Sequence, residues 1–450
     1  MTTVDLVVKG GRIYSSTGSI TSDIVVDEGK IIAISNDATL QQADRIIDAT
    51  GKLIFPGLVD THCHFRDPGF THKEDWETGS RAAAFGGVTF AIDMPNTTPP
   101  PNTVARFIEH QENANKKSLI DFNHWAMPTI REEIPKIAEA GAVGFKFFMK
   151  SAHYPYGSEF AIVDHAAMLE TFREIAKTGR PCAVHPHNQM IWEQRLERLK
   201  AEKRVDHEAF DEATYSDDAI METSAIAPLI LLANSEGCKL RVLHVYNVHN
   251  LKLVRALRNA GYNFTTEMNP WAVFPMRTGI GWTNERFSSE NMESDWEALN
   301  DGTIDVIGCD HAPNTRDEVE KAKANVFNSV ITVLTSVEFY LAMFLSEFHR
   351  GKITLEKLVE LWCENPAKHI GLFPKKGILQ TGADADFTII DLNHEWTIRA
   401  DDMVSKCKAT VYDGRKVKGA PTHTVVRGNL VVDNREVVGK PGYGEFTRPL

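Results

Sequence analysis

The sequence predicts an α/β protein in which a (β/α)8 TIM barrel, residues 55–374, carries a small β-sandwich domain built from residues 1–54 and 375–450. Short β-rich segments separated by turn residues fill the first part of the chain, and similar segments return near its end. Between them, apolar strands alternate with helical stretches, which is typical of βα units on a parallel sheet.

The two terminal segments share one kind of pattern. Asp23–Val26 and Lys30–Ile34 are β-branched runs separated by the turn pair Glu28-Gly29, as a hairpin requires. Similar runs recur in Ala385–Ile390 and Thr424–Val432. We therefore expect both segments to form one sandwich, with the two ends of the chain close in space.

About eight strands are expected in the central domain, enough to close it into a barrel. The run Leu53–Val59 opens the set, and a run near Leu119–Asn123 belongs to it. The remaining candidates are Val88–Ile92, Val143–Phe148, Cys182–Val184, Leu240–Leu243, Asn263–Thr266 and Ile304–Ile307. In such barrels the active site is built at the carboxyl ends of the strands.

Composition excludes several classes of protein. Lys and Arg total 49 against 61 Asp and Glu, a net charge of −12, so neither nucleic acid nor an anionic membrane surface is expected as the main partner. With no signal-like N-terminus and no membrane-spanning apolar run, we expect a cytoplasmic protein. The six cysteines form no Cys-x-x-Cys pair, so no disulfide framework or thiolate zinc site is expected.

The stretch Val59–Arg66 carries the first candidate site. Alternation along a strand would place His62, His64 and Arg66 on one side. Two histidines one residue apart can close on a single cation, because neutral imidazole nitrogen suits zinc and its neighbours. They could also be two ordinary polar residues at a strand end, so the rest of the chain must decide.

Four further polar residues end or interrupt predicted strands. Lys146 lies in the apolar run Ala142–Met149, where burial should lower its pKa. It could pair with a carboxylate, or its neutral amine could add carbon dioxide and become a carbamate that bridges two cations. Taken singly, His185 and His244 could be core histidines, and Asp310 could be a helix cap. At one barrel mouth, the whole set would be His62, His64, Lys146, His185, His244 and Asp310.

The chain resembles the cyclic-amide branch of the amidohydrolase superfamily, which includes dihydroorotases, allantoinases and hydantoinases. The resemblance covers nearly the whole length, and the set of motifs is specific although no single one is. The motifs are Ile54–Asp60, Glu77–Ala84, Gly86–Thr89, Asp310-His311-Ala312-Pro313, Asn365-Pro366-Ala367 and Gly382–Asp386.

This resemblance implies two divalent metal ions, usually zinc. One would be held by His62, His64 and Asp310, and the other by His185 and His244. Lys146, carbamylated by carbon dioxide or bicarbonate, would bridge them opposite a hydroxide, since two dications need anionic bridges. The implied reaction is attack of that hydroxide on the ring carbonyl of a small cyclic amide, with Asp310 passing the proton to the leaving nitrogen.

Arg66 and Asn96 are similar to the pair that binds the substrate carboxylate in dihydroorotases, and a bidentate arginine suits that role. Arg66 could instead pair with Asp67 or Glu74. The pair favours a dihydroorotase-like activity over a hydantoinase or dihydropyrimidinase, an allantoinase or a cyclic imide hydrolase.

Other stretches depart from the family pattern. Ser151 stands where hydantoinase-like sequences usually carry a tyrosine, and Pro270–Phe274 replaces the usual Pro-His-Tyr or Pro-Gln-Tyr. Three aromatic residues of this region could line an enlarged apolar pocket or pack against the barrel, namely Trp271, Phe274 and Trp282.

Two other functional classes fit the sequence less well. A catalytically silent relative with a structural role would tend to lose ligands, and a mononuclear deaminase would have no use for Lys146. We also expect a homo-oligomer, either a dimer or a tetramer.

Overall fold

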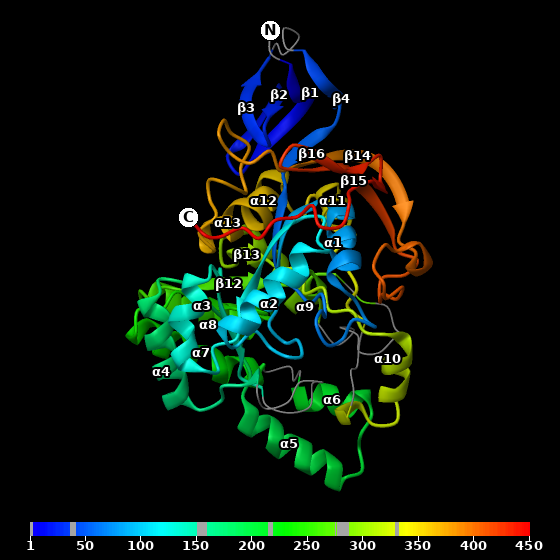
Figure 1. Ribbon diagram of the computed structural model, residues 1–450. Helices are drawn as coiled ribbons and strands as arrows, with labels where there is room; N and C mark the ends of the chain where they lie inside the picture. The colour runs from blue at the N-terminus through cyan, green and yellow to red at the C-terminus, as the bar shows by residue number, and fades with distance from the viewer. Residues whose placement is uncertain are drawn as a thin grey trace.

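The computed structural model describes residues 3–36, 42–150, 160–214, 219–274, 276, 288–328 and 333–450. Eight parallel strands form one sheet in sequence order (Figure 1). They are β6 (Leu58–Cys63), β7 (Val88–Asp93), β8 (Asp121–Ala126), β9 (Gly144–Phe148), β10 (Cys182–His185), β11 (Leu240–Val242), β12 (Thr265–Met268) and β13 (Val306–Ile307).

The sheet curls into a nearly closed barrel. At the seam between β6 and β13, Cys63 and His311 form a single parallel bridge, and the His64 N–H donates to the His311 carbonyl at 2.8 Å. The predicted (β/α)8 barrel is therefore confirmed.

Helices alternate with the strands and surround the barrel (Figure 1). Their apolar side chains recur at helical spacing, as in α4, where Met168, Phe172 and Ile175 are buried. The helices are α1 (Trp76–Phe85), α2 (Val104–Asn115), α3 (Ile134–Glu139), α4 (His165–Lys177), α5 (Gln189–Ala201), α6 (His207–Thr214), α7 (Ile220–Ser235), α8 (Val248–Asn259), α9 (Ser289–Asn300), α10 (Arg316–Ala322), α11 (Tyr340–Phe348), α12 (Leu355–Val359) and α13 (Asn365–His369).

Five shorter helical turns complete the helical structure of the described residues. Four are 3-10 turns, and η5 is a π-helical turn between α12 and α13. They are η1 (Arg131–Glu133), η3 (Pro270–Ala272), η4 (Val326–Asn328), η5 (Glu360–Glu364) and η6 (Ala400–Asp402).

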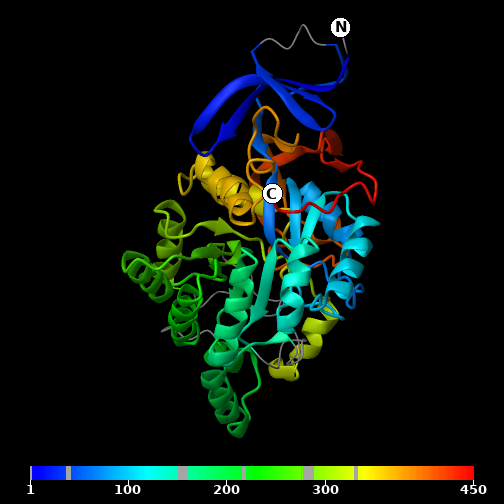
Figure 2. The ribbon, with the colours of Figure 1, turned by 60° about the vertical axis from the view of Figure 1, so that its left-hand side comes forward.

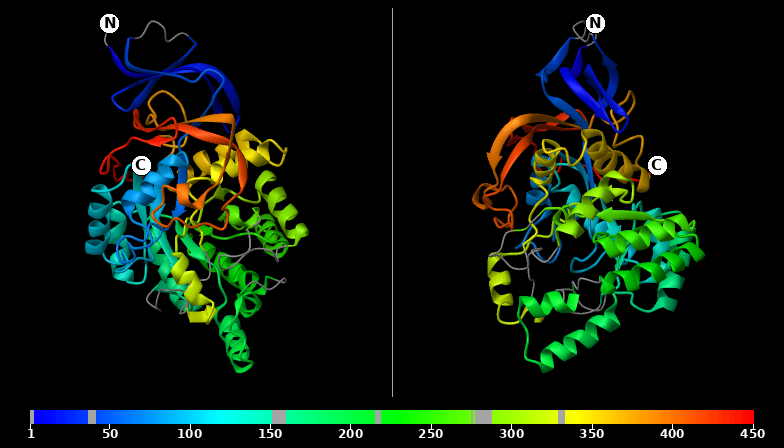
Figure 3. Two further views of the ribbon diagram at one scale, coloured as in Figure 1. Left: turned by 90° about the vertical axis from the view of Figure 1, so that its right-hand side faces the viewer. Right: turned by 180° about the vertical axis from the view of Figure 1, so that it is seen from behind.

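Both terminal segments join one further sheet, as predicted. Its order is β17-β16-β15-β14-β5-β1-β2-β3, with β4 paired to β1. Figure 2 shows β1 to β3 standing above the barrel, and Figure 3 shows β14 and β15 curving along its side. The strands are β1 (Val4–Ser15), β2 (Gly18–Asp27), β3 (Lys30–Ser35), β4 (Ala43–Asp48), β5 (Leu53–Pro56), β14 (Phe387–Thr397), β15 (Lys416–Val426), β16 (Asn429–Asp433) and β17 (Glu436–Val437).

The run Leu53–Val59, expected as one strand, is divided between the two sheets. β5 pairs with β1 and β14 of the terminal sheet, whereas β6 starts the barrel at Leu58. The change of sheet falls at Gly57, where a Cβ atom would lie 2.0 Å from Thr89 Oγ1. The domain boundary that we predict at residue 54 falls within β5.

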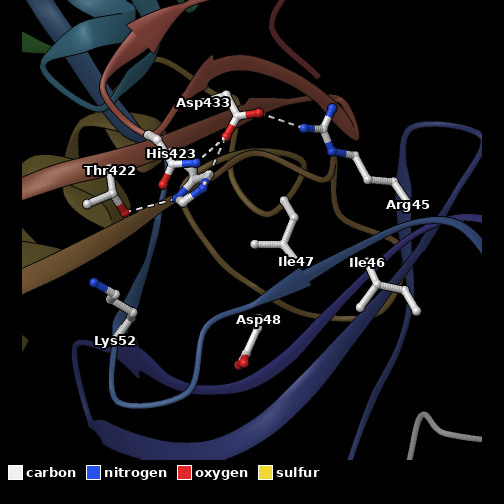
Figure 4. A pocket seen from close by; sticks show the side chains of 9 residues that line it. Arg45, Ile46, Ile47, Asp48, Lys52, Thr422, His423 and Asp433 are labelled. Carbon is white, nitrogen blue, oxygen red and sulfur yellow. Dashed lines mark hydrogen bonds and ion pairs between the residues drawn. The ribbon is translucent and has the colours of Figure 1, made fainter.

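A recess of about 410 Å³ lies in the terminal sheet (Figure 4). Among its lining residues, Arg45 Nη2 lies 2.7 Å from Asp433 Oδ2, and His423 Nε2 lies 3.4 Å from Asp433 Oδ1. None of the residues predicted for the site lines this recess. No helix of the described residues is both long and apolar enough to cross a membrane.

Candidate active site at the barrel mouth

Polar side chains gather at the carboxyl ends of the barrel strands, the end at which (β/α)8 barrels build active sites. The six predicted residues lie in, or shortly after, β6, β9, β10, β11 and β13. In strand order they are His62 and His64, Lys146, His185, His244 and Asp310.

Four imidazole rings stand in a row at this mouth. The ring centroids of His64 and His62 are 5.4 Å apart, and those of His62 and His244 are 5.0 Å apart. The His185 ring follows at 4.6 Å from His244. Asp310 lies beside the row, with Oδ1 at 3.3 Å from Nε2 of both His62 and His64. Atoms of His62, His244 and Asp310 all lie within 4.8 Å of one another, close enough to hold a metal ion.

Protein oxygens fix the orientation of three of these rings. A carboxylate or amide oxygen accepts a hydrogen bond from each Nδ1, which leaves the Nε2 lone pair available to a ligand. The pairs are His62 with Glu267 Oε1 at 2.5 Å, His64 with Asn96 Oδ1 at 2.7 Å, and His244 with Asn269 Oδ1 at 2.5 Å.

Lys146 is fully buried in β9. Its Nζ lies 4.0 Å from the centroid of the Phe148 ring and has no hydrogen-bond partner among the described residues. Burial lowers the pKa of Lys146 to about 7, although the negative charges of Glu267 and Asp310 act against this shift. Much of the amine is therefore neutral at neutral pH, the form that can react as a nucleophile.

The pKa values of His64, His244 and Asp310 are shifted as well. Burial lowers the pKa of His64 to about 3 and that of His244 to about 4, so both rings are neutral at pH 7. Burial acts to raise the pKa of Asp310, but the neighbouring His62, His64 and His244 side chains outweigh it and lower that pKa. The mouth thus combines the neutral imidazoles of His64 and His244 with an ionised carboxylate, a donor set that suits zinc and related cations.

Two of these residues adopt backbone conformations that are unusual for side chains with a Cβ. His244 has φ 56° and Asp310 has φ 49°, both in the left-handed region. Such positions are sparsely populated and cluster at functional sites, where the surrounding structure holds them.

Arg66 and Asn96, the predicted carboxylate binders, lie beside the same row. Arg66 is 1% exposed, and its Nε donates to the Pro313 carbonyl at 3.2 Å. Arg66 follows the end of β6 and has φ 63°, so strand alternation does not extend to it. Asp67, an alternative partner in the sequence, accepts from Lys117 Nζ at 2.6 Å. Asn96 contributes its amide oxygen to the His64 ring.

Sequence reasoning missed the residues that orient two of the histidines. Glu267 and Asn269 lie at alternate positions of β12 and its extension, so both point inward. Glu267 also accepts from Arg241 Nη1 at 3.2 Å, within the core. Polar residues at alternate positions of a barrel strand were the available signal, but the predicted strand, Asn263–Thr266, ended before them.

Of the three aromatic residues singled out in the sequence, Trp271 and Phe274 lie in the described part of the chain. Phe274 packs against Tyr340 and Phe344, with ring centroids 6.2 and 4.9 Å away, so it belongs to the core. Trp271 lies against the site, with its indole nitrogen 3.2 Å from Asp310 Oδ2. Ser151 and Trp282 fall outside the described residues.

Comparisons with known proteins agree with this architecture. The model of the amidohydrolase family matches residues 53–431. L-hydantoinase from Paenarthrobacter aurescens is 35% identical over 455 residues, covering 98% of this chain and 97% of the relative. Dihydroorotase from Lactobacillus helveticus is 33% identical, covering 96% of this chain and 99% of the relative. The solved L-hydantoinase (dihydropyrimidinase) from Arthrobacter aurescens has a TM-score of 0.92 at 34% identity, covering 99% of this chain and all of that one.

Fold and site together define a (β/α)8-barrel protein with a histidine-rich centre at the carboxyl ends of its strands. The matched family model and the full-length relatives then settle its membership. This chain belongs to the amidohydrolase family, and the resemblance seen in its sequence motifs is confirmed.

Proposed function

We propose that this chain is a metal-dependent hydrolase that opens the amide bond of a small cyclic amide. The observation that carries the proposal is the row of histidines whose Nδ1 atoms are bound by protein oxygens while Nε2 of His62 and His64 faces Asp310. The relatives named as a hydantoinase and a dihydroorotase support the same class of reaction.

Two divalent ions, most suitably zinc, fit the residues present. His62, His64 and Asp310 would hold one, and His185 and His244 the other. The buried Lys146 amine, without a hydrogen-bond partner among the described residues, fits the bridging role as a carbamate. Its nitrogen would form a bond to the carbon of carbon dioxide and release a proton. When bound, two such ions lower the pKa of water and polarise a carbonyl group.

The protein's own residues supply the proton transfer and the geometry. Asp310 is ionised, so it can accept a proton as water adds to the ring carbonyl and return it to the amide nitrogen when the C–N bond breaks. Glu267 and Asn269 hold the His62 and His244 rings, so the ligand atoms need little rearrangement.

A neutral hydantoin-type ring is our first candidate substrate. Its support is that the matched solved structure is named an L-hydantoinase, and that a full-length relative 35% identical to this chain is named an L-hydantoinase too. Dihydroorotate is the second candidate, because the Arg66 charge lies close enough to His64 to lower the pKa of that ring.

Metal content and Lys146→Ala test the proposal together. We expect close to two divalent ions per chain in the protein loaded with zinc and bicarbonate, and ring opening in a screen of hydantoins, dihydropyrimidines, dihydroorotate, allantoin and cyclic imides. Lys146→Ala should lose metal and at least about 100-fold in kcat, since the anionic bridge disappears. Short carboxylic acids should restore part of both.

Lys136→Ala provides a control, because that exposed lysine pairs only with Glu133 among the described residues. It should keep full metal content and activity. At most one metal ion in fully active protein, or full activity in Lys146→Ala, would contradict the binuclear proposal.

A further inference from the structure

One segment of the chain contacts three residues of the site. Glu267 and Asn269 bind the Nδ1 atoms of His62 and His244. Continuing the alternation, Trp271 in η3 donates its indole N–H to Asp310 Oδ2 at 3.2 Å.

The two oxygens of the Asp310 carboxylate face different partners. Oδ2 faces the indole, whereas Oδ1 lies 3.3 Å from Nε2 of both His62 and His64. Asp310 has φ 49°, so its own backbone does not favour this placement and neighbouring contacts must hold it.

The indole is held by its surroundings. Trp271 is 5% exposed and its ring meets Tyr246 edge-on at 5.0 Å. The turn that carries it is closed by the Ala272 N–H donating to the Asn269 carbonyl at 3.0 Å. A donor held this firmly loses little freedom when it binds the carboxylate.

We propose that Trp271 is the positioning residue for Asp310. Its N–H anchors Oδ2 and thereby keeps Oδ1 turned toward the histidine row. This inference rests on the proposed hydrolytic function and adds one residue to the site.

The sharpest test replaces the N–H alone. Nonsense suppression can place β-(3-benzothienyl)alanine at position 271, which keeps the shape of the ring but puts sulfur where the N–H was. We expect kcat for the substrate found in the screen to fall about 10- to 100-fold, the contribution of a hydrogen bond to a charged group. KM should stay within about 2-fold, because the ring still fills its place.

Two comparisons separate positioning from packing. The same analogue at Trp296, which packs on Phe274 and Phe344, should leave kcat unchanged. Trp271→His, which offers a ring N–H, should recover part of the activity that Trp271→Phe loses. A benzothienyl protein within 2-fold of wild type at position 271, or one no slower than the Trp296 analogue, would overturn the inference.

A second readout does not depend on turnover. In protein loaded with Co²⁺, the visible absorption bands report the geometry of the ligands around the ion. They should change with the analogue at position 271 and stay unchanged with the analogue at 296. If wild type opens no cyclic amide, the proposed function fails while this spectrum still decides the role of Trp271: altered bands support it and identical bands overturn it.

Discussion

Buried ionisable side chains give this protein its most distinctive residue-scale properties. The site contains several of them, and Asp295 in α9 is another, outside the site. Asp295 Oδ1 accepts from the Asn247 N–H at 2.8 Å, while Oδ2 is buried without a hydrogen-bond partner among the described residues. Burial raises the pKa of Asp295 to about 8.

This shift predicts a pH-dependent stability. The unfolded chain releases the Asp295 proton near the ordinary value of 3.8, whereas the folded protein keeps it to about pH 8. Between these values the folded state binds more protons, so this residue lowers the free energy of unfolding by about 1.4 kcal/mol for each pH unit gained. Asp295→Asn should remove that slope in denaturant titrations between pH 5 and 8.

Asp301→Asn serves as the matched control, because the pKa of Asp301 is lowered by Thr303 and Arg255 despite partial burial. Its pKa lies below the tested range, so it should leave the slope unchanged. An Asp295→Asn protein with the wild-type slope would show that Asp295 is ionised in the fold.

A second residue-scale prediction separates the two candidate substrates by charge. If Arg66 holds a ring carboxylate, Arg66→Met should lower kcat/KM for dihydroorotate by about 2–5 kcal/mol, the usual cost of removing one partner of a buried charged pair. Neutral hydantoin should change much less. Steady-state kinetics on both rings measures the difference, and equal losses would mean that Arg66 supports the fold or the metal centre.

At the scale of elements, close packing of α1 positions the first histidines. Gly79 on α1 leaves room for Phe65, which lies between His64 and Arg66 in the chain; a Cβ at Gly79 would be 2.3 Å from Phe65 Cδ1. The helix starts at an Asp75 capping box, so its register against this segment is fixed.

Gly79→Ala is therefore expected to destabilise the protein although alanine favours helices. The helix gains about 1 kcal/mol, but forcing the Phe65 ring aside costs about 1–3 kcal/mol or more. Thermal unfolding should move to lower temperature and metal content should fall, because Phe65 adjoins His64. Adding Phe65→Leu should recover part of the loss; a single variant as stable as wild type would show that the ring moves freely.

At the scale of the whole molecule, one buried ion cluster joins the terminal sheet to the barrel. Lys376 Nζ lies 2.7 Å from Asp121 Oδ2 at the start of β8, and 2.9 and 2.6 Å from Asp384 and Asp386, which precede β14. Arg427 Nε, directly after β15, also lies 3.1 Å from Asp121. Asp121 and Lys376 are 255 residues apart in the sequence, so the cluster joins two distant parts of the chain.

Lys376→Met should cost about 3–5 kcal/mol of stability, the usual effect of leaving buried charges without their partner. Denaturant unfolding would measure it, with Lys368→Met as control because that lysine is 47% exposed and its only ion pair among the described residues is with Glu364. A Lys376→Met protein as stable as this control would mean that the carboxylates take up protons at little cost.

Oligomeric state and cellular location stay predictions at this scale. Light scattering after size-exclusion chromatography would test the expected dimer or tetramer. The ligand roles of the six mouth residues likewise stay predictions until metal is measured in the variants.

The amino-acid sequence by itself determined the barrel and the terminal sheet. Hydrophobic periodicity and turn residues are local properties, and polar residues that end apolar strands, such as His185 and His244, must meet at one mouth once the strands run parallel. Family motifs then indicated the chemistry.

Tertiary structure alone decided which partners those residues meet. The pairing of β5 with β14 divides the run Leu53–Val59 between two sheets. Glu267 contacts His62, and Trp271 contacts Asp310. Each of these contacts joins segments that are far apart in the chain. No local pattern encodes such contacts, because they depend on how strands curve and which side chains then lie within 3 Å or so of one another, a distance at which hydrogen bonds form.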